Sequence, residues 1–272
     1  MDETDGAVAH GYDIVPLAQL AQGGRWRTEA MRSYSRPVLI WFTKGQGRVT
    51  ISGVKRGYGA HNAIFLPAGT MHGFDMLGQV FGSVIFFPRD RDLGLPQDPT
   101  HLRIRDARRQ AELNSYVDQI QTELSKSDMN SARALDLITG LMAVWVSRQD
   151  DLADPDLSEL SAANRLSAAY CSLLERDFRS PKSVASYARE LGVTPTHLSR
   201  VCNMTTGKPA LDIRTDRVHT EARRMLRETD LPIQDIATKL GFASPAYFTR
   251  AFAKHVGMTP SRFRQAGDKI PA

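Results

Sequence analysis

The sequence predicts two domains, an N-terminal all-β domain with appended helices and a C-terminal all-α bundle. Short apolar runs separated by glycine-containing turns fill residues 12–88, and from about residue 106 the apolar residues recur at helical spacing. Residues 159–272 contain an internal repeat of helical character. A chain of 272 residues is long enough for two domains. We expect a β domain, a helical segment, a linker and a helical domain at residues 1–98, 99–149, 150–157 and 158–266.

Composition and charge exclude several classes of protein. No apolar run approaches the about 18 residues of a membrane span, and the acidic N-terminal stretch is unlike a secretory signal. Cys171 and Cys202 offer neither a disulfide framework nor metal-ligand spacing, so we expect a cytoplasmic protein with no membrane partner. Residues 159–272 carry 18 Lys and Arg against 11 Asp and Glu, whereas residues 1–158 carry 17 against 19. A basic half joined to a near-neutral half is typical of a polyanion-binding module attached to another domain.

The first half predicts short antiparallel strands of a barrel or sandwich, followed by helices. The strand candidates are PVLIWFTKG, GRVTIS, NAIFLPAG and GSVIFFP. Two helical stripes follow, formed by Leu113, Val117, Ile120 and Leu124 and by Leu135, Ile138, Met142 and Trp145. The second stripe either joins two subunits of a homodimer through residues near 106–148 or packs against its own β domain, and the sequence leaves both open. The acidic, proline-broken stretch 148–158 predicts a linker between domains.

The C-terminal half contains two copies of one motif. The first reads VASYARELGVTPTHLSRVCNMTTG (184–207) and the second reads IQDIATKLGFASPAYFTRAFAKHVG (233–257). Matching residues are offset by 49 before the turn and by 50 after it, so the second copy has one extra residue in its turn. Each copy has an apolar helical face, a glycine where the chain leaves the helix, and a hydroxyl N-cap before a proline. These are the parts of a helix-turn-helix unit.

The second helix of each copy has an outward face of small residues and one arginine. Arg200 and Arg250 occupy the same outward position, while apolar residues such as Leu198 and Phe248 point inward. Small neighbours permit close approach to a major groove, and arginine can bond guanine bidentately. One copy alone would fit an ordinary helical bundle equally well, whereas two copies favour double-stranded DNA as the partner. The candidate DNA-contacting residues are Thr196, His197, Ser199, Arg200, Asn203, Ala246, Tyr247, Thr249, Arg250 and Lys254.

The segment between the copies, residues 209–228, predicts one long helix. About 20 helical residues span about 30 Å, which is close to the about 34 Å of one turn of B-DNA. A single chain could therefore place its two recognition helices in successive major grooves on one face of the duplex.

The second copy and its surroundings resemble the signature of the AraC/XylS family of bacterial regulators. The matching stretches are IATKLGF, SPAYFTRAF, GMTPSRFR (257–264), HLSR and EARRML with the preceding Arg217. The resemblance covers roughly residues 158–266 and implies a seven-helix DNA-binding domain with recognition helices near 195–204 and 245–254. Two residues depart from the family pattern. Phe263 replaces a common Tyr, and Cys202 stands where a bulky aromatic is common, so we expect the first recognition helix to be seated less firmly.

FTKGQGRVTI and FLPAGTMHGF resemble the cupin-like barrel that such regulators often carry as an effector domain, over about residues 12–88. The PAGTMH stretch places His72 at a usual metal-ligand position, but the other ligands of the cupin motif are missing from residues 41–53. One imidazole cannot complete a catalytic metal site, so we expect no metal, no other cofactor and no catalytic residue. We expect instead a pocket for a small-molecule effector, lined by Trp41, Lys44, His72 and Phe74.

The sequence thus favours an effector-responsive transcription regulator. The family's commoner mode makes it an activator, which implies RNA polymerase as a further partner. The alternative is a cupin-type enzyme with an accessory DNA-binding domain, which the missing metal ligands disfavour. A redox sensor based on Cys171 and Cys202 is weaker, because thiols at inward helical positions are usually inert.

Overall fold

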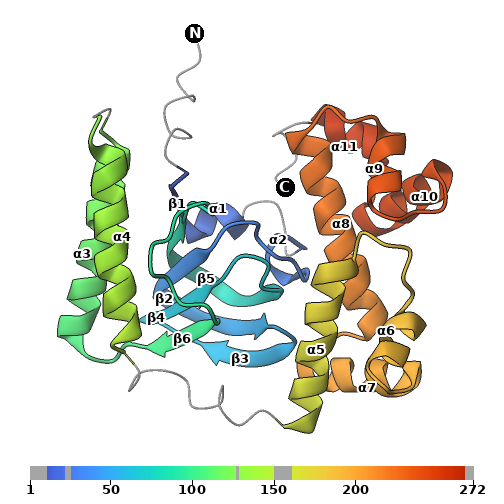
Figure 1. The fold of residues 1–272 in the computed structure, drawn as a ribbon, viewed down its shortest axis with the longest axis horizontal. Helices are drawn as coiled ribbons and strands as arrows, with labels where there is room; N and C mark the ends of the chain where they lie inside the picture. Colours follow the sequence, from blue (N-terminus) through green and yellow to red (C-terminus); the bar gives the residue numbers. More distant parts are fainter. Residues whose placement is uncertain (1–10, 22–25, 127–128, 150–160, 267–272) are drawn as a thin grey trace.

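The computed structural model describes residues 11–21, 26–126, 129–149 and 161–266. Figure 1 shows an antiparallel sheet at the centre, with α3 (Ala107–Leu124) and α4 (Ser131–Ser147) on one side and the C-terminal helices on the other. The expected order, a sheet domain followed by a helical domain, is confirmed. No helix in these ranges is both long and apolar enough to cross a membrane.

A six-stranded antiparallel sheet forms the N-terminal part. Its strands pair in the order β1-β5-β2-β4-β6, and β3 forms a hairpin with β2. The end strands β1 and β6 are not paired with each other in the described residues, so the sheet does not close and the expected cupin-like barrel is not confirmed. The strands and the two short helices α1 and α2 are β1 (Asp13–Pro16), α1 (Leu17–Ala21), α2 (Trp26–Glu29), β2 (Val38–Ile51), β3 (Val54–Tyr58), β4 (Asn62–Leu66), β5 (His72–Phe86) and β6 (Thr100–Arg103).

The long strand β2 places alternate side chains on the two faces of the sheet, as its period of two requires. Leu39 and Trp41 lie in the apolar cluster that includes α3 and α4, whereas Ile40 and Phe42 lie in a second cluster with Tyr58. The ring of Phe42 stacks on that of Tyr58 with centroids 4.2 Å apart. Burial of each such side chain contributes about 1.5–3 kcal/mol to folding. The sheet is therefore held by an apolar cluster on each face.

Helix α4 packs its Leu135 stripe against its own sheet. Leu135, Met142 and Trp145 are buried in the same cluster as Trp41. Hydrogen bonds reinforce this layer, because the Trp41 indole N–H donates to Asn114 Oδ1 of α3 at 2.7 Å. The structure thus decides between the two interpretations of this stripe. It corrects the expectation that Leu135 and Met142 hold two subunits together.

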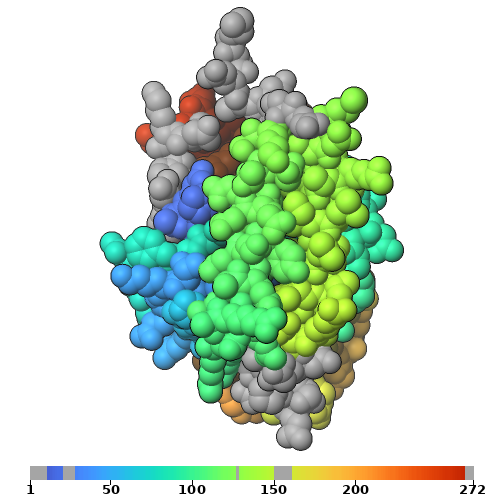
Figure 2. All heavy atoms as spheres, turned by 90° about the vertical axis from the view of Figure 1, so that its left-hand side faces the viewer, coloured from blue at the N-terminus to red at the C-terminus, as the bar shows by residue number. Residues whose placement is uncertain are grey.

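A different apolar stripe on α4 faces outward. Leu137, Leu141 and Val144 follow one another at i, i+4 and i+7 and are 62%, 62% and 46% exposed. Gly140 lies among them, and a Cβ added there would meet no atom within 4 Å. Figure 2 looks onto the side of the molecule that α3 and α4 cover. We call Leu137, Gly140, Leu141 and Val144 the outer stripe.

Seven helices make up the described C-terminal part, residues 161–266, as the resemblance implies. Their buried side chains form one apolar cluster that continues into the N-terminal part through Met31 and Met71. Helix α8 is the longest of the seven and lies between the two helix pairs α6–α7 and α9–α10 in sequence. The seven helices are α5 (Ala162–Asp177), α6 (Val184–Glu190), α7 (Pro195–Thr206), α8 (Ala210–Glu228), α9 (Ile233–Lys239), α10 (Pro245–Val256) and α11 (Pro260–Ala266).

Hydrogen bonds to α5 and near α8 join the sheet domain to the helices, and one of them runs from the Ser33 hydroxyl to Glu175 Oε1 of α5 at 2.7 Å. The tip of the β2–β3 hairpin lies against α5, where the Ser167 hydroxyl donates to Gly53 O at 3.0 Å. Gly53 has a φ of +78°, and a Cβ there would lie 2.5 Å from Ser167 Oγ, so only glycine fits. On α8, Asp216 Oδ2 accepts from the Met31 N–H at 3.2 Å and from Lys208 Nζ at 2.6 Å. Lys208 Nζ also donates to Glu29 O at 2.9 Å.

Candidate nucleic-acid interface

Local signals set the bounds of the helix pair α6–α7. Helix α7 begins at Pro195, and the preceding Thr194 hydroxyl accepts from the His197 N–H at 3.2 Å. This cap satisfies one of the free N–H groups of the first turn, and proline presets the φ that the helix needs. Between the helices, Gly192 adopts a φ of +70°, which lets the chain leave α6 and turn into α7. A helix, α7, is thus present where the first recognition helix was predicted, near residues 195–204.

The second helix pair repeats these interactions. Helix α10 begins at Pro245 after a cap in which Ser244 Oγ accepts from the Tyr247 N–H at 3.2 Å. The bond that closes α9, from the Phe242 N–H to Ala237 O at 3.0 Å, corresponds to the 2.9 Å bond from Val193 to Ala188 after α6. The two pairs therefore share their hydrogen bonds as well as their residues.

Two aromatic residues and one cysteine seat the recognition helices. Phe248 and Phe252 anchor α10, and the Phe252 ring lies 5.6 Å from the ring of Phe263. Cys202 lies on the inward face of α7 and is fully buried, at the place where related regulators commonly have an aromatic residue. Burial raises the pKa of the Cys202 thiol to about 11 and raises that of Cys171 as well. Both thiols stay protonated near neutral pH, which does not favour a redox role.

The exposed faces of α7 and α10, here called the reading faces, carry the predicted contact residues. Arg200 and Arg250 are both exposed at the equivalent place, and Arg200 Nη2 lies 3.3 Å from His197 Nδ1. Ser199 and Thr249, also at equivalent places, are half-buried. The other predicted contacts are exposed, and they are Thr196, His197, Asn203, Ala246, Tyr247 and Lys254.

Helix α8 connects the two pairs without a break. It has 19 residues, which span about 28 Å. Its buried Arg217 is held against α5, because its Nε donates to Glu175 Oε2 at 2.6 Å. Arg217 also pairs with Glu221 at 3.3 Å and lies 3.7 Å above the Phe178 ring. These contacts fix the long helix against α5.

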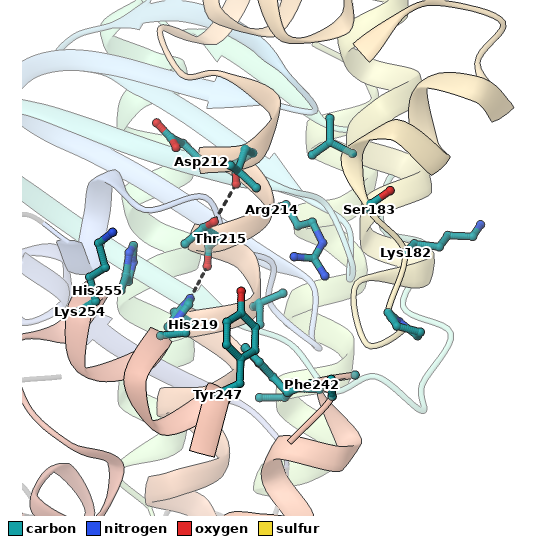
Figure 3. A pocket seen from close by; sticks show the side chains of 18 of the residues that line it. Lys182, Ser183, Asp212, Arg214, Thr215, His219, Phe242, Tyr247, Lys254 and His255 are labelled. Atoms are coloured by element: carbon teal, nitrogen blue, oxygen red, sulfur yellow. Dashed lines mark hydrogen bonds between the residues drawn. The ribbon is translucent and has the colours of Figure 1, made fainter. Parts of the chain in front are cut away.

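A cleft of about 930 Å³ lies between the two helix pairs (Figure 3). One wall is the start of α6, the floor is the first half of α8, and the other wall is the turn before α10 together with one side of α10. Its polar and charged lining residues are Lys182, Ser183, Asp212, Arg214, Thr215, His219, Tyr247, Lys254 and His255. Two of these, Tyr247 and Lys254, were predicted from the sequence as contact residues.

Arg214 was not predicted, and it is the least expected residue of the cleft. Its Nε is buried and has no hydrogen-bond partner among the described residues. Nothing in the spacing of α8 distinguishes this arginine from those that form ion pairs. The position of Arg214 in the cleft follows only from the way α6, α8 and α10 pack together.

The four predicted effector-binding residues do not meet in one place. His72 and Phe74 lie together, with ring centroids 5.8 Å apart. Trp41 lies in the cluster of α3 and α4 on the other face of the sheet. Lys44 is exposed on β2, and its Nζ lies 5.9 Å from the Phe81 ring. Lys44 is seven residues from Ile51, the β2 partner of His72, which corresponds to about 23 Å along the strand.

His72 is buried with one ring nitrogen unsatisfied. Its Nδ1 bonds Thr70 O at 2.9 Å, whereas Nε2 has no partner among the described residues. Burial lowers the pKa of His72 to about 3, so the imidazole is neutral and Nε2 can accept a hydrogen bond. In the described ranges no group of three or more His, Cys, Asp or Glu side chains is placed to hold a metal ion.

Comparison with known proteins assigns the C-terminal part. Residues 187–266 match the family described as a helix-turn-helix domain. The probable transcription factor PqrA of Proteus vulgaris is 37% identical over 84 residues, which are 31% of this chain and 69% of that protein. The transcriptional regulator GlxA of Rhizobium meliloti (strain 1021) is 34% identical over 111 residues, 39% of this chain and 34% of that protein. The chain thus spans only about a third of the length of GlxA.

Among solved structures, ToxT from Vibrio cholerae O395 is similar over 93% of this chain and 96% of that chain, with 15% identity and a TM-score of 0.41. The arabinose operon regulatory protein of Escherichia coli (strain K12) is 33% identical over 81 residues, 30% of this chain and 28% of that protein. The repeated helix pairs agree with the sequence match to the helix-turn-helix family and with the similarity to PqrA. The chain belongs to the AraC/XylS family of helix-turn-helix transcription regulators.

Proposed function

We propose that this chain regulates transcription by reading two successive major grooves of duplex DNA, one with each helix pair. The observation that carries the proposal is the repeated reading face, an exposed arginine at the same place on α7 and α10. Each arginine stands on a helix seated by buried residues and started by the same cap and proline. The about 28 Å of α8 is close to the about 34 Å between successive major grooves on one face of the duplex.

The two reading faces differ in chemistry. Thr196 and Asn203 beside Arg200 can hydrogen-bond base edges, whereas Ala246 beside Arg250 offers only a methyl contact. We propose that the first helix pair supplies more of the hydrogen-bonded base recognition. The second relies more on thymine methyl groups, Arg250 and phosphate contacts, with Thr249 and Lys254 as phosphate partners.

Selection of binding sites from random-sequence duplexes tests this proposal. Arg200→Ala and Arg250→Ala are each expected to cost about 1–3 kcal/mol and to relax the preference at one or two base pairs. The two affected patches are expected about 10 bp apart. Arg105→Ala is the matched control, since Arg105 is exposed and lies in the sheet domain, away from both reading faces. Uniform weakening by Arg200→Ala with unchanged base preference would show that its face does not enter the groove.

We also propose that the sheet domain binds a small-molecule effector without a metal, with His72 Nε2 as a polar contact. A buried nitrogen without a partner is costly, and a ligand hydroxyl or amide would satisfy it. A thermal-shift screen of small molecules is expected to find compounds that stabilise the wild type but not His72→Phe. A chelator is expected to leave the melting temperature of the full chain unchanged. A large loss of stability on chelation would show that a metal is needed.

We further propose a homodimer formed through the outer stripe of α4. A stripe in one line along a helix can pair with its own copy about a two-fold axis. Gly140 supports a second copy as the occupant, because a helix-interior glycine costs about 1 kcal/mol relative to alanine and no atom of the described residues lies within 4 Å of a Cβ added there. A second helix could approach closely at that point. Leu141→Glu is expected to give monomers by sedimentation, whereas Gln121→Glu on exposed α3 is not.

The remaining aspects rest on the family. We propose an activator that acts in the cytoplasm and contacts RNA polymerase, as the commoner mode of the AraC/XylS family implies. A reporter gene placed behind the selected binding site tests the sign of regulation. Activation requires higher reporter output with the wild type than with the Arg200→Ala variant.

A further inference from the structure

The cleft between the helix pairs contains a guanidinium that the reading faces do not use. Arg214 on α8 is half-buried, its Nε is shielded from solvent without a partner, and it forms no hydrogen bond or ion pair with another described residue. Buried polar groups are nearly always hydrogen-bonded, and arginines below the surface are usually paired with an acid. An anion bound in the cleft would therefore satisfy the unpaired guanidinium of Arg214.

The charges of the cleft favour an anion as well. Lys182, Arg214 and Lys254 line it against one carboxylate, Asp212. Lys182 is already engaged, because its Nζ lies 2.6 Å from Asp177 and 2.8 Å from Glu190, both outside the cleft lining. Arg214 and Lys254 are thus the cations left for a ligand. A guanidinium can bind two oxygens of one phosphate at once.

The hydroxyl group of Tyr247 adds a further donor on the Arg214 side of the cleft, and Figure 3 shows both side chains lining the same space. The Ser183 hydroxyl on the opposite wall is engaged in the cap of α6, where it accepts from the Ser186 N–H at 3.2 Å. Tyr247 is 55% exposed and has a phenolic hydroxyl that can donate to an oxygen. The cleft therefore presents free donors from α8 and α10 toward one space.

The place of the cleft indicates which anion it meets. Tyr247 and Lys254 stand on α10 beside Arg250, so this wall borders the second reading face. The opposite wall is the start of α6, and the first helix of a helix-turn-helix unit crosses the DNA backbone. If α7 lies in one major groove and α10 lies in the next, a DNA backbone strand runs between the two helices.

We propose that this cleft holds a backbone phosphate of the DNA strand that runs between the two grooves, with Arg214 as its main contact. The inference rests on the proposed reading of DNA by both helix pairs and assigns α8 a contact of its own. Phosphate contacts position the protein and carry no direct base information. The Arg214 contact therefore fixes the spacing of the two reading faces on the duplex without adding to base preference.

The salt dependence of binding tests the contact. The probe is the tightest duplex recovered from the selection with the wild type, and a random-sequence duplex serves as the non-specific probe. Arg214→Gln is expected to reduce the slope of log affinity against log salt by about 0.9 for both probes. Doubling the salt concentration then weakens the wild type about twofold more than the variant. Arg105→Gln, which removes one exposed charge far from the cleft, is expected to keep the wild-type slope.

Three further measurements keep the test independent of the stability of the variant. Phosphate-ethylation interference with the wild type is expected to show a sensitive phosphate between the two base patches, and Arg214→Lys is expected to retain most of the salt slope. The base preference of Arg214→Gln is expected to match that of the wild type.

The outcomes separate this inference from the function on which it rests. If the wild type shows no base preference in the selection, the proposed reading of DNA fails. If it does show one, but Arg214→Gln keeps the full slope and no central phosphate is sensitive, only the cleft assignment fails. If inorganic phosphate raises the melting temperature of the wild type but not of Arg214→Gln, while DNA binding is unchanged, the cleft is a site for a free anion and the proposal is overturned.

Discussion

Replacing Gly140 by alanine is expected to change the stability of the monomer and the affinity of the proposed dimer in opposite directions. Gly140 is in the interior of the 17-residue helix α4, and a Cβ there meets no atom within 4 Å. Because the methyl group causes no clash and alanine restricts the unfolded chain, Gly140→Ala is expected to raise the free energy of unfolding by about 0.5–1 kcal/mol. Most substitutions in a helix would do the reverse.

The same methyl group is expected to weaken the dimer. If a second α4 packs over Gly140, each copy adds a methyl where the backbones approach, and such overpacking costs about 1–3 kcal/mol. Since 1.4 kcal/mol is about tenfold in a dissociation constant, the proposed dimer weakens by between about fivefold and about 150-fold. Sedimentation over a range of concentrations measures this change. Chemical unfolding at a concentration where the chain is monomeric measures the expected gain in the free energy of unfolding.

Two results would refute the reasoning. A lower unfolding free energy for monomeric Gly140→Ala would mean that the space around Gly140 is not free. An unchanged or tighter dimer would mean that α4 helices do not meet at this glycine. Leu141→Glu then shows whether the outer stripe takes part at all.

Three further predictions concern stability. Leu135→Ala is expected to cost about 2–5 kcal/mol in urea unfolding, because it opens a cavity between α4 and the sheet, and a loss below 1 kcal/mol would contradict its burial. The pKa of His72 is about 3 when folded and about 6.5 when unfolded, so the unfolded chain binds more protons and stability falls as pH drops from about 6.5 toward 3. His72→Gln is expected to flatten that dependence, and an unchanged slope would exclude His72 as its source. Gly53→Ala is expected to destabilise the chain by about 1–3 kcal/mol by calorimetry, because a Cβ meets Ser167 at a positive φ, whereas Gly57→Ala has open space and serves as its control.

The ends of the recognition helices could be predicted because their signals are local. Thr194 and Pro195 specify the start of α7 within a few residues, and Ser244 and Pro245 do the same for α10. Capping and proline geometry do not depend on the rest of the fold. The reading faces followed from the same local period, so the exposure of Arg200 was also predictable.

The packing of α4 could not be predicted, because both of its faces are apolar. Leu135 and Met142 lie on one stripe, and Leu137 and Leu141 lie on the other. A helical period identifies each stripe but does not say which one meets the sheet. The sheet partner that decides it, Trp41, is about a hundred residues away in sequence.

The faces of the sheet on which the candidate effector residues lie, and the cleft, could not be predicted for a related reason. Trp41 and Phe74 look alike as aromatic strand residues, but they belong to clusters on opposite faces of the sheet. Arg214 became noticeable only when α6, α8 and α10 were seen to enclose it. Tertiary packing decides which distant segments meet, and the spacing of residues along the sequence does not reveal it.

If both helix pairs read DNA as proposed, the unbroken α8 sets the distance and the angle between them. Two modules on one chain bind with an effective concentration that their connection sets, so each can be weak alone while the pair binds tightly. A flexible tether would leave their separation free, whereas a helix fixes it in steps of about 1.5 Å and about 100° per residue. Inserting a single residue into α8 would therefore turn the second reading face away from the duplex. Natural lengthening of this connection would have to come in whole helical turns, and the spacing of the recognised base patches would change with it.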